Sequence, residues 1–222
     1  MHIHKIPLET WERRSQFEHY LNRVPCTYNM CVHMDVTHVL AAAKANGLRF
    51  FPVIAFALSH VVNHHREFCM TLTPDRQPAY FDVVHPCYTV FHSQAECFSN
   101  VWTAYDPVFS NFYEQYLKDR RQYGGPVPAG DKPCPDGNIF YISCIPWVSF
   151  DSFQLQAVSD PPCLAPIFTI GKYYGEKDRM LMPLSVQVHH AACDGFHTAR
   201  LVNEVQEWLD RFQPDRKEGA FD

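Results

Sequence analysis

The last fifth of the chain carries the pattern that most constrains the fold: a strand, a short histidine-rich corner and an amphipathic helix. Residues 180–188 are largely apolar and include two β-branched valines, which is typical of a buried strand. From Asp194 to residue 212, apolar side chains recur three or four positions apart, the spacing of one helix face. Aspartate is also a favoured helix N-cap. The sequence therefore predicts that His189 and His190 end a strand and that Asp194 begins a helix.

Three interpretations of this corner compete. In the first, Asp194 is only a helix cap and the histidines are ordinary turn residues. In the second, Asp194 and the histidines at 189, 190 and 197 bind a metal, although no cysteine pair or H-E-x-x-H motif accompanies them. In the third, one histidine is a general base braced by the carboxylate, because neutral imidazole accepts protons near pH 7. The local pattern alone leaves all three open.

Composition narrows the class of protein. A chain of 222 residues suits one large domain or two small ones, and 46% hydrophobic residues can bury a sizeable core. The net charge of −5 is spread along the chain, which argues against a nucleic-acid or anionic-membrane partner. The longest apolar run, residues 50–62, contains a proline and is too short to span a membrane. Nine cysteines without C-x-x-C spacing, and an N-terminus without an apolar signal core, predict free thiols and a cytoplasmic location.

The rest of the chain mixes helical and strand patterns without a strict β-α-β alternation. Helices are expected over residues 10–21 (capped by Thr10), 36–46, 52–62 and 107–123. Strands are expected over residues 28–36, 88–92, 139–147, 148–158 and 166–174, with two short strands inside 71–84. Residues 166–174 and 180–188 are expected to form a hairpin around 175–178, and residues 124–138 a surface loop. These patterns predict one domain over residues 1–222, an α/β protein of the α+β type with helices packed on a mixed β-sheet.

Several motifs resemble those of the chloramphenicol acetyltransferase family. The string His190-x-x-x-Asp194-Gly195 resembles the H-x-x-x-D-G signature of coenzyme-A-dependent acyltransferases, and the whole stretch 183–197 is similar to the narrower family. Further similar segments are W-x-R-R-x-x-F-x-x-Y at 11–20, R-F-F-P-V at 49–53, Y-T-V-F-H at 88–92 and a strand motif ending in Pro146-Trp147. The resemblance runs from residue 11 to 208, and the 124–138 loop departs from it. It implies the fold of the coenzyme-A-dependent acyltransferases.

The resemblance also implies a reaction, the transfer of an acetyl group from acetyl-CoA to a hydroxyl of chloramphenicol. His190 would be the general base, and the hydroxyl of Ser143 would stabilise the oxyanion of the tetrahedral intermediate. Arg13 would form an ion pair with Asp194 and thereby support the corner that carries the histidine. Family members are homotrimers with active sites between subunits, so the resemblance implies the same assembly here.

Binding residues follow from the same resemblance. The positions that match the acceptor pocket are Tyr20, Cys26, Phe98, Phe153, Leu155 and Thr169. On pattern alone, each of these would be an ordinary core residue. Lys172 and Tyr173 match positions at the nucleotide end of coenzyme A, and Arg49 is a further candidate for a phosphate. No metal is expected.

Three alternatives stay open. Tyr141 and His19 are not the residues expected at their positions, so the acceptor of the acyl group could be a different small hydroxylated molecule. A cysteine nucleophile, Cys26 or Cys193, would also transfer acetyl groups, by way of a thioester intermediate. A binding module or a metal-bound regulatory domain would need no catalysis at all.

Overall fold

A mixed β-sheet forms the centre of the molecule. The computed structural model describes residues 2–134, 136–155 and 159–214. The large sheet consists, in spatial order, of β2 (Thr27–Asp35), β10 (Arg179–His189), β8 (Ile167–Gly171), β7 (Ile139–Ile145), β5 (His85–His92) and β6 (Cys97–Trp102), while β9 (Tyr174–Glu176) pairs with the start of β10. The pairs β5–β7 and β7–β8 are parallel, and the other pairs of this sheet are antiparallel. The predicted mixed sheet is therefore confirmed.

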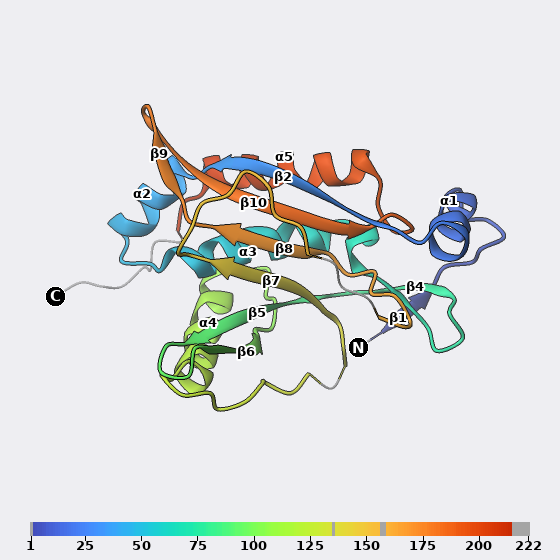
Figure 1. Cartoon of the computed structure of the whole chain (residues 1–222), viewed down its shortest axis with the longest axis horizontal. Coiled ribbons are helices and arrows are strands. Elements are labelled where there is room, and N and C mark those ends of the chain that lie inside the picture. The colour runs from blue at the N-terminus through green and yellow to red at the C-terminus, as the bar shows by residue number, and fades with distance from the viewer. Residues whose placement is uncertain (1, 135, 156–158, 215–222) are drawn as a thin grey trace.

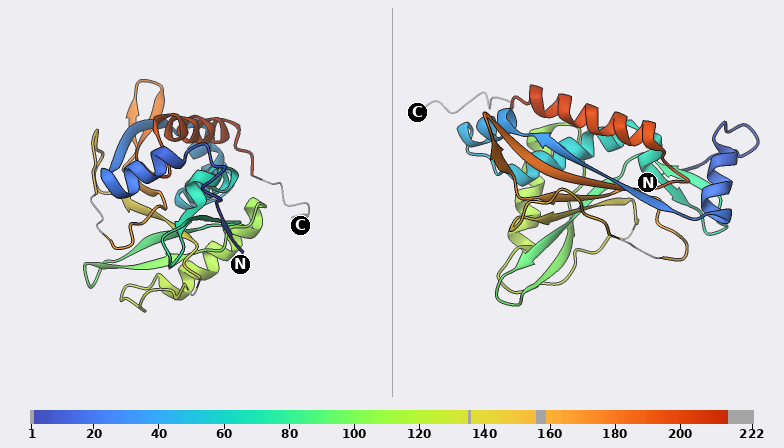
Figure 2. Two further views of the ribbon diagram at one scale, coloured as in Figure 1. Left: turned by 90° about the vertical axis from the view of Figure 1, so that its right-hand side faces the viewer. Right: turned by 45° about the horizontal axis from the view of Figure 1, so that its top comes forward.

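Helices cover one face of this sheet. They are α2 (Thr37–Ala45), α3 (Phe50–His64), α4 (Phe109–Tyr123) and α5 (Gly195–Arg211), while α1 (Arg14–Glu18) lies at one end of the molecule (Figure 1). Helix α3 is the most buried, because apolar residues surround almost its whole circumference. Pro52 lies in its first turn, where a missing backbone N–H costs no hydrogen bond. Helix α5 lies beside α3 and follows the long strands β2 and β10 (Figures 1 and 2).

A second, smaller sheet lies at the end of the molecule that also carries α1 (Figure 1). It consists of β1 (Ile3–Lys5), β4 (Pro78–Phe81) and β3 (Met70–Leu72), all antiparallel. The two short strands expected inside residues 71–84 are thus confirmed, whereas β1 was not predicted from the sequence. Within the described ranges, no helix is both long enough and apolar enough to cross a membrane.

The predicted hairpin before the corner is also confirmed, with a tighter turn than expected. Gly175 and Glu176 belong to β9, so that only Lys177 and Asp178 connect the two strands. Lys177 adopts a positive φ of 53°, which a turn this short requires.

The first helix begins later than predicted. Thr10 was expected to cap a helix over residues 10–21, but α1 begins at Arg14 and continues into a π-helical turn over His19–Arg23. The Thr10 hydroxyl donates instead to the carbonyl of Pro7, in the turn before the helix. The apolar spacing still brings Trp11 against Phe17, with ring centroids 5.3 Å apart.

The strand predicted over residues 148–158 was wrong. Residues 148–155 have no regular structure, and residues 156–158 lie outside the described residues. Side chains, rather than a strand ladder, hold this segment on the sheet. The carbonyl of Phe153 accepts hydrogen bonds from Ser185 Oγ (3.0 Å) and Cys31 Sγ (3.6 Å). The segment therefore packs on the sheet through these contacts instead of joining it as a strand.

The loop at 124–138 is anchored from its middle. Lys132 Nζ lies 2.7 Å from Asp119 Oδ1 on α4 and 4.2 Å from the centre of the Trp102 ring. The side chain of Asp119 is only 5% exposed, so the loop lysine neutralises a buried charge. Asp119 also accepts a hydrogen bond from Thr103, which in turn bonds the hydroxyl of Tyr88. The loop is thereby connected to the interior of the sheet.

Candidate active site

The corner after β10 brings together the residues that the sequence singled out. His189 is the last residue of β10, and Asp194 is the N-cap of α5, where it accepts a hydrogen bond from the N–H of Phe196 (3.1 Å). His190 lies between the two elements, and its backbone N–H donates to the carbonyl of Cys26 (3.0 Å). The predicted strand end and helix start are both confirmed.

The hydrogen bonds of His190 determine which nitrogen is free. Its Nδ1 lies 3.1 Å from the carbonyl oxygen of Cys193, and a carbonyl can only accept. Nδ1 therefore carries the proton, and in the neutral ring Nε2 keeps its lone pair. The ring of Tyr20 stacks on the imidazole with centroids 3.8 Å apart, and Tyr28 meets it edge-on at 5.3 Å. The ring is held in place while one basic nitrogen remains available.

His189 has a different environment. It is 5% exposed, and burial, together with the neighbouring His190, lowers its pKa. Its Nδ1 accepts a hydrogen bond from the N–H of Ala191 (3.2 Å), so its proton lies on Nε2. The backbone carbonyl of His189 also accepts from the N–H groups of Ala192 and Cys193. These contacts give His189 a role in holding the turn.

An ion pair connects the two ends of the chain at this corner. Arg13 Nη1 lies 2.5 Å from Asp194 Oδ2, and His197 Nδ1 lies 2.8 Å from Asp194 Oδ1. Burial alone would raise the pKa of Asp194, but the hydrogen bond from Arg13 and the charge of His197 outweigh it and hold that pKa below its ordinary value. The pair braces the start of α5, four residues after His190. The carboxylate bonds Arg13 and His197, whereas Nδ1 of His190 bonds the carbonyl of Cys193.

A row of small polar side chains crosses the sheet. Ser143 on β7 pairs with Thr169 on β8, which pairs with Ser185 on β10, which pairs with Cys31 on β2. Paired residues of neighbouring strands point to the same face, so these side chains share one face of the sheet. The residues directly before Ser143, Thr169 and Ser185 are Ile142, Phe168 and Leu184, and all three belong to the hydrophobic core. Because successive side chains of a strand point to opposite faces, the polar row lies on the face away from the core. Phe153 covers the Ser185–Cys31 end of this row.

Ser143 lines a cavity of about 460 Å³. Phe98 also lines it, as the resemblance predicts, with 62% of its surface exposed. The remaining walls are mostly aromatic or aliphatic and come from α3, β5, α4 and the end of β7: Phe51, Tyr88, Thr89, Val90, Phe91, Tyr116, Arg120, Cys144, Ile145, Pro146 and Trp147. The cavity suits a ligand with an extended apolar chain or a ring that lies beside the hydroxyl of Ser143. Arg120 is the one basic residue of this lining, and nothing in the sequence pattern separated it from its exposed neighbour Arg121.

The predicted catalytic residues lie apart within one chain. Ser143 is two strands away from Ser185, and Ser185 precedes His190 by five residues. With about 3.3 Å per residue and about 4.8 Å between strands, Ser143 and His190 are on the order of 15–20 Å apart. His190 does not line the Ser143 cavity. The two residues of one chain therefore cannot act on the same reacting carbonyl.

The predicted binding residues divide in the same way. Tyr20 and Cys26 contact His190, whereas Phe98 lies with Ser143, and Thr169 is 2% exposed in the row beside it. Leu155 is 44% exposed near the end of the irregular segment. Among the described residues of this chain, no cavity is lined by all six predicted positions.

Two of the residues predicted for coenzyme A, Arg49 and Tyr173, lie near the start of α3. Arg49 precedes this helix, and its N–H donates to the hydroxyl of Tyr113 (2.9 Å) on α4. The next residue, Phe50, meets the ring of Tyr173 edge-on at 5.5 Å. Lys172 and Tyr173 follow the end of β8, and both are exposed. The Tyr173 ring therefore lies beside the residue that follows Arg49, and Lys172 is its neighbour in the chain.

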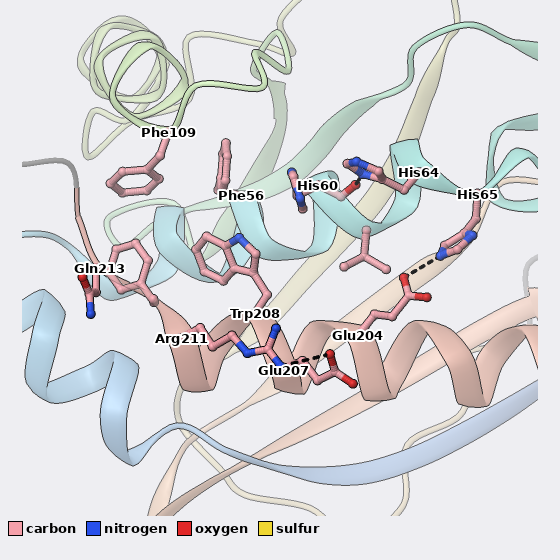
Figure 3. Close-up of a pocket in the computed structure, with 12 residues that line it drawn as sticks. Phe56, His60, His64, His65, Phe109, Glu204, Glu207, Trp208, Arg211 and Gln213 are labelled. Atoms are coloured by element: carbon pink, nitrogen blue, oxygen red, sulfur yellow. Dashed lines mark hydrogen bonds and ion pairs between the residues drawn. The ribbon is translucent and has the colours of Figure 1, made fainter.

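A second cavity, of about 710 Å³, lies between α3 and α5 (Figure 3). It contains none of the predicted site residues, and two ion pairs lie within its wall. His65 Nε2 lies 2.5 Å from Glu204 Oε2, and Arg211 lies 3.7 Å from Glu207. Across the described ranges, no group of three or more His, Cys, Asp or Glu side chains is arranged to hold a metal ion.

The fold is that of an acyltransferase. A solved structure named chloramphenicol acetyltransferase aligns with a TM-score of 0.84 at 20% identity, over 94% of this chain and 100% of the other. The truncated catalytic core of a 2-oxoacid dehydrogenase complex from Thermoplasma acidophilum aligns with a TM-score of 0.66 at 11% identity, over 88% and 92% of the two chains.

The chain belongs to the chloramphenicol acetyltransferase family, whose model matches residues 1–206. A chloramphenicol acetyltransferase from Vibrio anguillarum is 43% identical over 96% of this chain and 97% of its own length. One from Clostridium butyricum is 40% identical over the same shares. The resemblance stated from the motifs is thereby confirmed, and the chain belongs to a family of enzymes, which removes the support for a non-enzymatic module.

Proposed function

We propose that the protein transfers the acetyl group of acetyl-CoA to a hydroxyl of chloramphenicol. The observation that carries the proposal is the hydrogen bond from His190 Nδ1–H to the carbonyl of Cys193, in a chain of this family. It leaves Nε2 unprotonated on a ring that Tyr20 holds by stacking. Such a nitrogen is equipped to accept the proton of an alcohol.

The reaction begins at the hydroxyl of the acceptor. An alcohol is a weak nucleophile until its proton leaves, so His190 Nε2 takes that proton as the C–O bond forms to the thioester carbonyl. The carbonyl π electrons move to its oxygen, which gives a tetrahedral oxyanion. Its collapse breaks the C–S bond, and the thiolate of coenzyme A takes the proton from the imidazolium. The products are the acetyl ester and free coenzyme A, and no acyl-enzyme is needed.

Ser143 is proposed to donate a hydrogen bond to the oxyanion. Its side chain faces away from the core and lines a cavity with apolar walls, where one donor is stronger than it would be in water. No intramolecular acceptor is recorded for its hydroxyl among the described residues. The hydroxyl is therefore available to a bound intermediate.

We infer that each active site forms between two subunits of a homotrimer. The wide separation of His190 and Ser143 within one chain supports this inference, since both must reach the same carbon. Strand β2 is at one edge of the large sheet, next to the strand that ends at His189. His190, with Tyr20 and Cys26, would come from one subunit, and Ser143 with Phe98 from its neighbour.

The remaining predicted residues complete the proposal. Phe153, Leu155 and Thr169 would contribute to the acceptor pocket, and Lys172, Tyr173 and Arg49 would bind the nucleotide end of coenzyme A. Arg13 and Asp194 would support the corner without touching the reacting atoms. We expect an enzyme that acts in the cytoplasm and needs no metal.

The test is consumption of the acetyl-CoA thioester, followed by its absorbance, with and without chloramphenicol. Direct absorbance is preferable to a thiol reagent, because the chain has nine cysteines. Consumption that depends on chloramphenicol supports the proposal. If folded protein consumes no thioester with chloramphenicol, this acceptor is wrong.

A second candidate keeps the chemistry and changes the acceptor. Tyr141 lies two residues before Ser143 on β7, hence on the same face of the sheet, and is 37% exposed. Its phenol is a bulky polar group near the proposed pocket, and burial raises its pKa, so it remains a hydrogen-bond donor at neutral pH. A screen of other hydroxylated acceptors with Tyr141→Phe would reveal such a preference.

The cysteine mechanism receives less support from the geometry. Cys193 is 1% exposed, and burial raises the pKa of its thiol well above the ordinary value. It stays protonated at neutral pH and is a poor nucleophile. Unchanged turnover in Cys193→Ala would remove this mechanism for Cys193.

A further inference from the structure

Arg120 is a cation in the wall of the Ser143 cavity, and its charge has no carboxylate partner among the residues that the structure describes. It lies in the last turn of α4 and lines the cavity together with Ser143 and Trp147. Its Nη1 atom is buried and makes no hydrogen bond to any described residue. The acid beside it in the sequence, Asp119, is already bonded to Lys132 (2.7 Å) and Thr103 (2.9 Å). A buried donor without a partner is costly, so a polar partner that reached this guanidinium, such as a water molecule or a ligand oxygen, would stabilise it.

The surrounding chain fixes the position of this guanidinium. A Cβ atom at Gly124 would lie 2.6 Å from Arg120 Nη1, so glycine at this position leaves the space that the guanidinium occupies. Tyr116, one turn earlier on the same helix, also holds the Arg120 side chain, through a side-chain hydrogen bond. Burial raises the pKa of Tyr116 to about 12, and the charge of Arg120 opposes that rise. The guanidinium is held between the two and is not a freely moving surface charge.

A second cation lies nearby. The charge of Arg49 also acts on Tyr116, which places both arginines around one phenol. Arg49 precedes Phe50, whose ring contacts Tyr173, and it bonds Tyr113 on α4. Arg120 thus gives a largely apolar cavity one basic wall, and Arg49, which does not line the cavity, carries its charge near the same phenol. A long ligand with an apolar arm and an anionic end fits this distribution of charge.

We propose that Arg120 binds a phosphate of the acyl donor, and this proposal rests on the proposed function. A guanidinium offers paired donors that match phosphate oxygens, whereas chloramphenicol is neutral and supplies no anion. The donor would place its thioester beside Ser143 and its charged end beside Arg120 and Arg49. Arg120 thereby becomes a binding residue for the donor and does not act on the reacting atoms.

Steady-state kinetics of Arg120→Leu test this assignment against Arg121→Leu. Arg121 is the exposed neighbour on the same helix and does not line the cavity, so it controls for a general loss of positive charge. With acetyl-CoA varied at saturating acceptor, Arg120→Leu should raise KM about 10- to 100-fold, the range expected for a lost hydrogen bond to a charged group. The value of kcat should change little, and Arg121→Leu should match wild type. Equal KM values for wild type and Arg120→Leu would overturn the proposal.

Acetyl-pantetheine separates the phosphates from the rest of the donor, because it has the thioester and the amide arm but no phosphate ester. With this donor, wild type and Arg120→Leu should have the same KM. A loss as large as that with acetyl-CoA would mean that Arg120 acts on the arm or on pocket shape, and the phosphate assignment would be wrong. A rise confined to the KM of chloramphenicol would also contradict it.

Calorimetric titration with coenzyme A alone separates this proposal from the proposed function. If wild type binds coenzyme A and Arg120→Leu binds it about 10- to 100-fold more weakly, Arg120 is a donor-binding residue even if chloramphenicol is not the acceptor. If both proteins bind it equally, the assignment fails whatever the activity. Unchanged thermal melting of Arg120→Leu is the accompanying check that the fold is intact.

Discussion

The Ser143 cavity and the cavity between α3 and α5 are built from similar side chains and differ in how their charges are satisfied. Both have walls of aromatic rings together with charged groups. Between α3 and α5, His65 pairs with Glu204 and Arg211 with Glu207 (Figure 3). In the Ser143 cavity, Arg120 Nη1 has no partner among the described residues. The charges of the larger cavity are therefore paired within it, whereas the smaller cavity has a donor that the proposed ligand would satisfy.

The largest loss of rate is expected for a substitution of His190. The same substitution of a histidine in the cavity between α3 and α5 serves as the control. His190→Gln should lower kcat by about 10²- to 10⁴-fold, because it removes the proposed general base for the alcohol proton. His60→Gln, on α3, should leave kcat unchanged. Steady-state rates with melting temperatures for both variants check this. Comparable losses of rate in the two variants would break the distinction between the cavities.

Removing the proposed oxyanion donor should have the next largest effect. Ser143→Ala should raise the barrier by about 2.7–4 kcal/mol and keep the melting temperature of wild type. Ser59→Ala is the matched control, because the Ser59 hydroxyl is buried on α3 and donates to the carbonyl of Ala55 (2.6 Å). That variant should keep its rate and change stability by no more than about 1.5 kcal/mol. Turnover of Ser143→Ala at the wild-type rate would remove Ser143 from the mechanism.

Acid should weaken the corner through Asp194. Because the pKa of Asp194 is lower in the folded protein than its ordinary value, its ion pair stabilises the fold above the ordinary pKa. That contribution is lost as the pH falls through the folded pKa. The dependence of unfolding free energy on pH below about 5 should therefore be flatter in Asp194→Asn than in wild type. Asp210→Asn, an exposed change on the same helix, should leave the slope as it is, and identical slopes for all three proteins would contradict the account.

The smallest effect is expected at the paired charges of the helix cavity. The side chain of Glu204 is 38% exposed, so solvent screens its ion pair with His65. Glu204→Gln should cost at most about 1 kcal/mol of unfolding free energy in chemical denaturation, with no change in the KM of either substrate. A change in KM would show that this cavity takes part in binding.

Local patterns predicted the corner, and distant contacts decided the rest of the site. The strand ending at His189 and the helix capped by Asp194 follow from apolar spacing and cap chemistry, which depend only on neighbouring residues. The ion pair of Arg13 with Asp194 joins residues 181 positions apart, and only the family resemblance pointed to it.

The features that the sequence did not predict correctly have a common cause. Residues 148–155 have the composition of a strand, but Ser185 and Cys31 bind the backbone of Phe153 from the sheet face and keep the segment out of the ladder. Arg120 and Arg121 are equivalent in sequence, and only the position of Gly124 and Tyr116 gives the first of them a fixed place in the cavity. Contacts between segments that are distant in the sequence determine these structures, and the spacing of apolar residues does not reveal such contacts.

The central claim is that His190 of one subunit and Ser143 of another act on the same intermediate, and mixed oligomers test it most directly. His190→Gln and Ser143→Ala subunits, each nearly inactive alone, are unfolded together in equal amounts, refolded and assayed for chloramphenicol-dependent loss of acetyl-CoA. If sites form between subunits, random assembly gives an intact His190 facing an intact Ser143 in about a quarter of them, and activity should recover to about that fraction of wild type. If the mixture stays as inactive as its components while refolded wild type regains its rate, the two residues do not share a site across the interface.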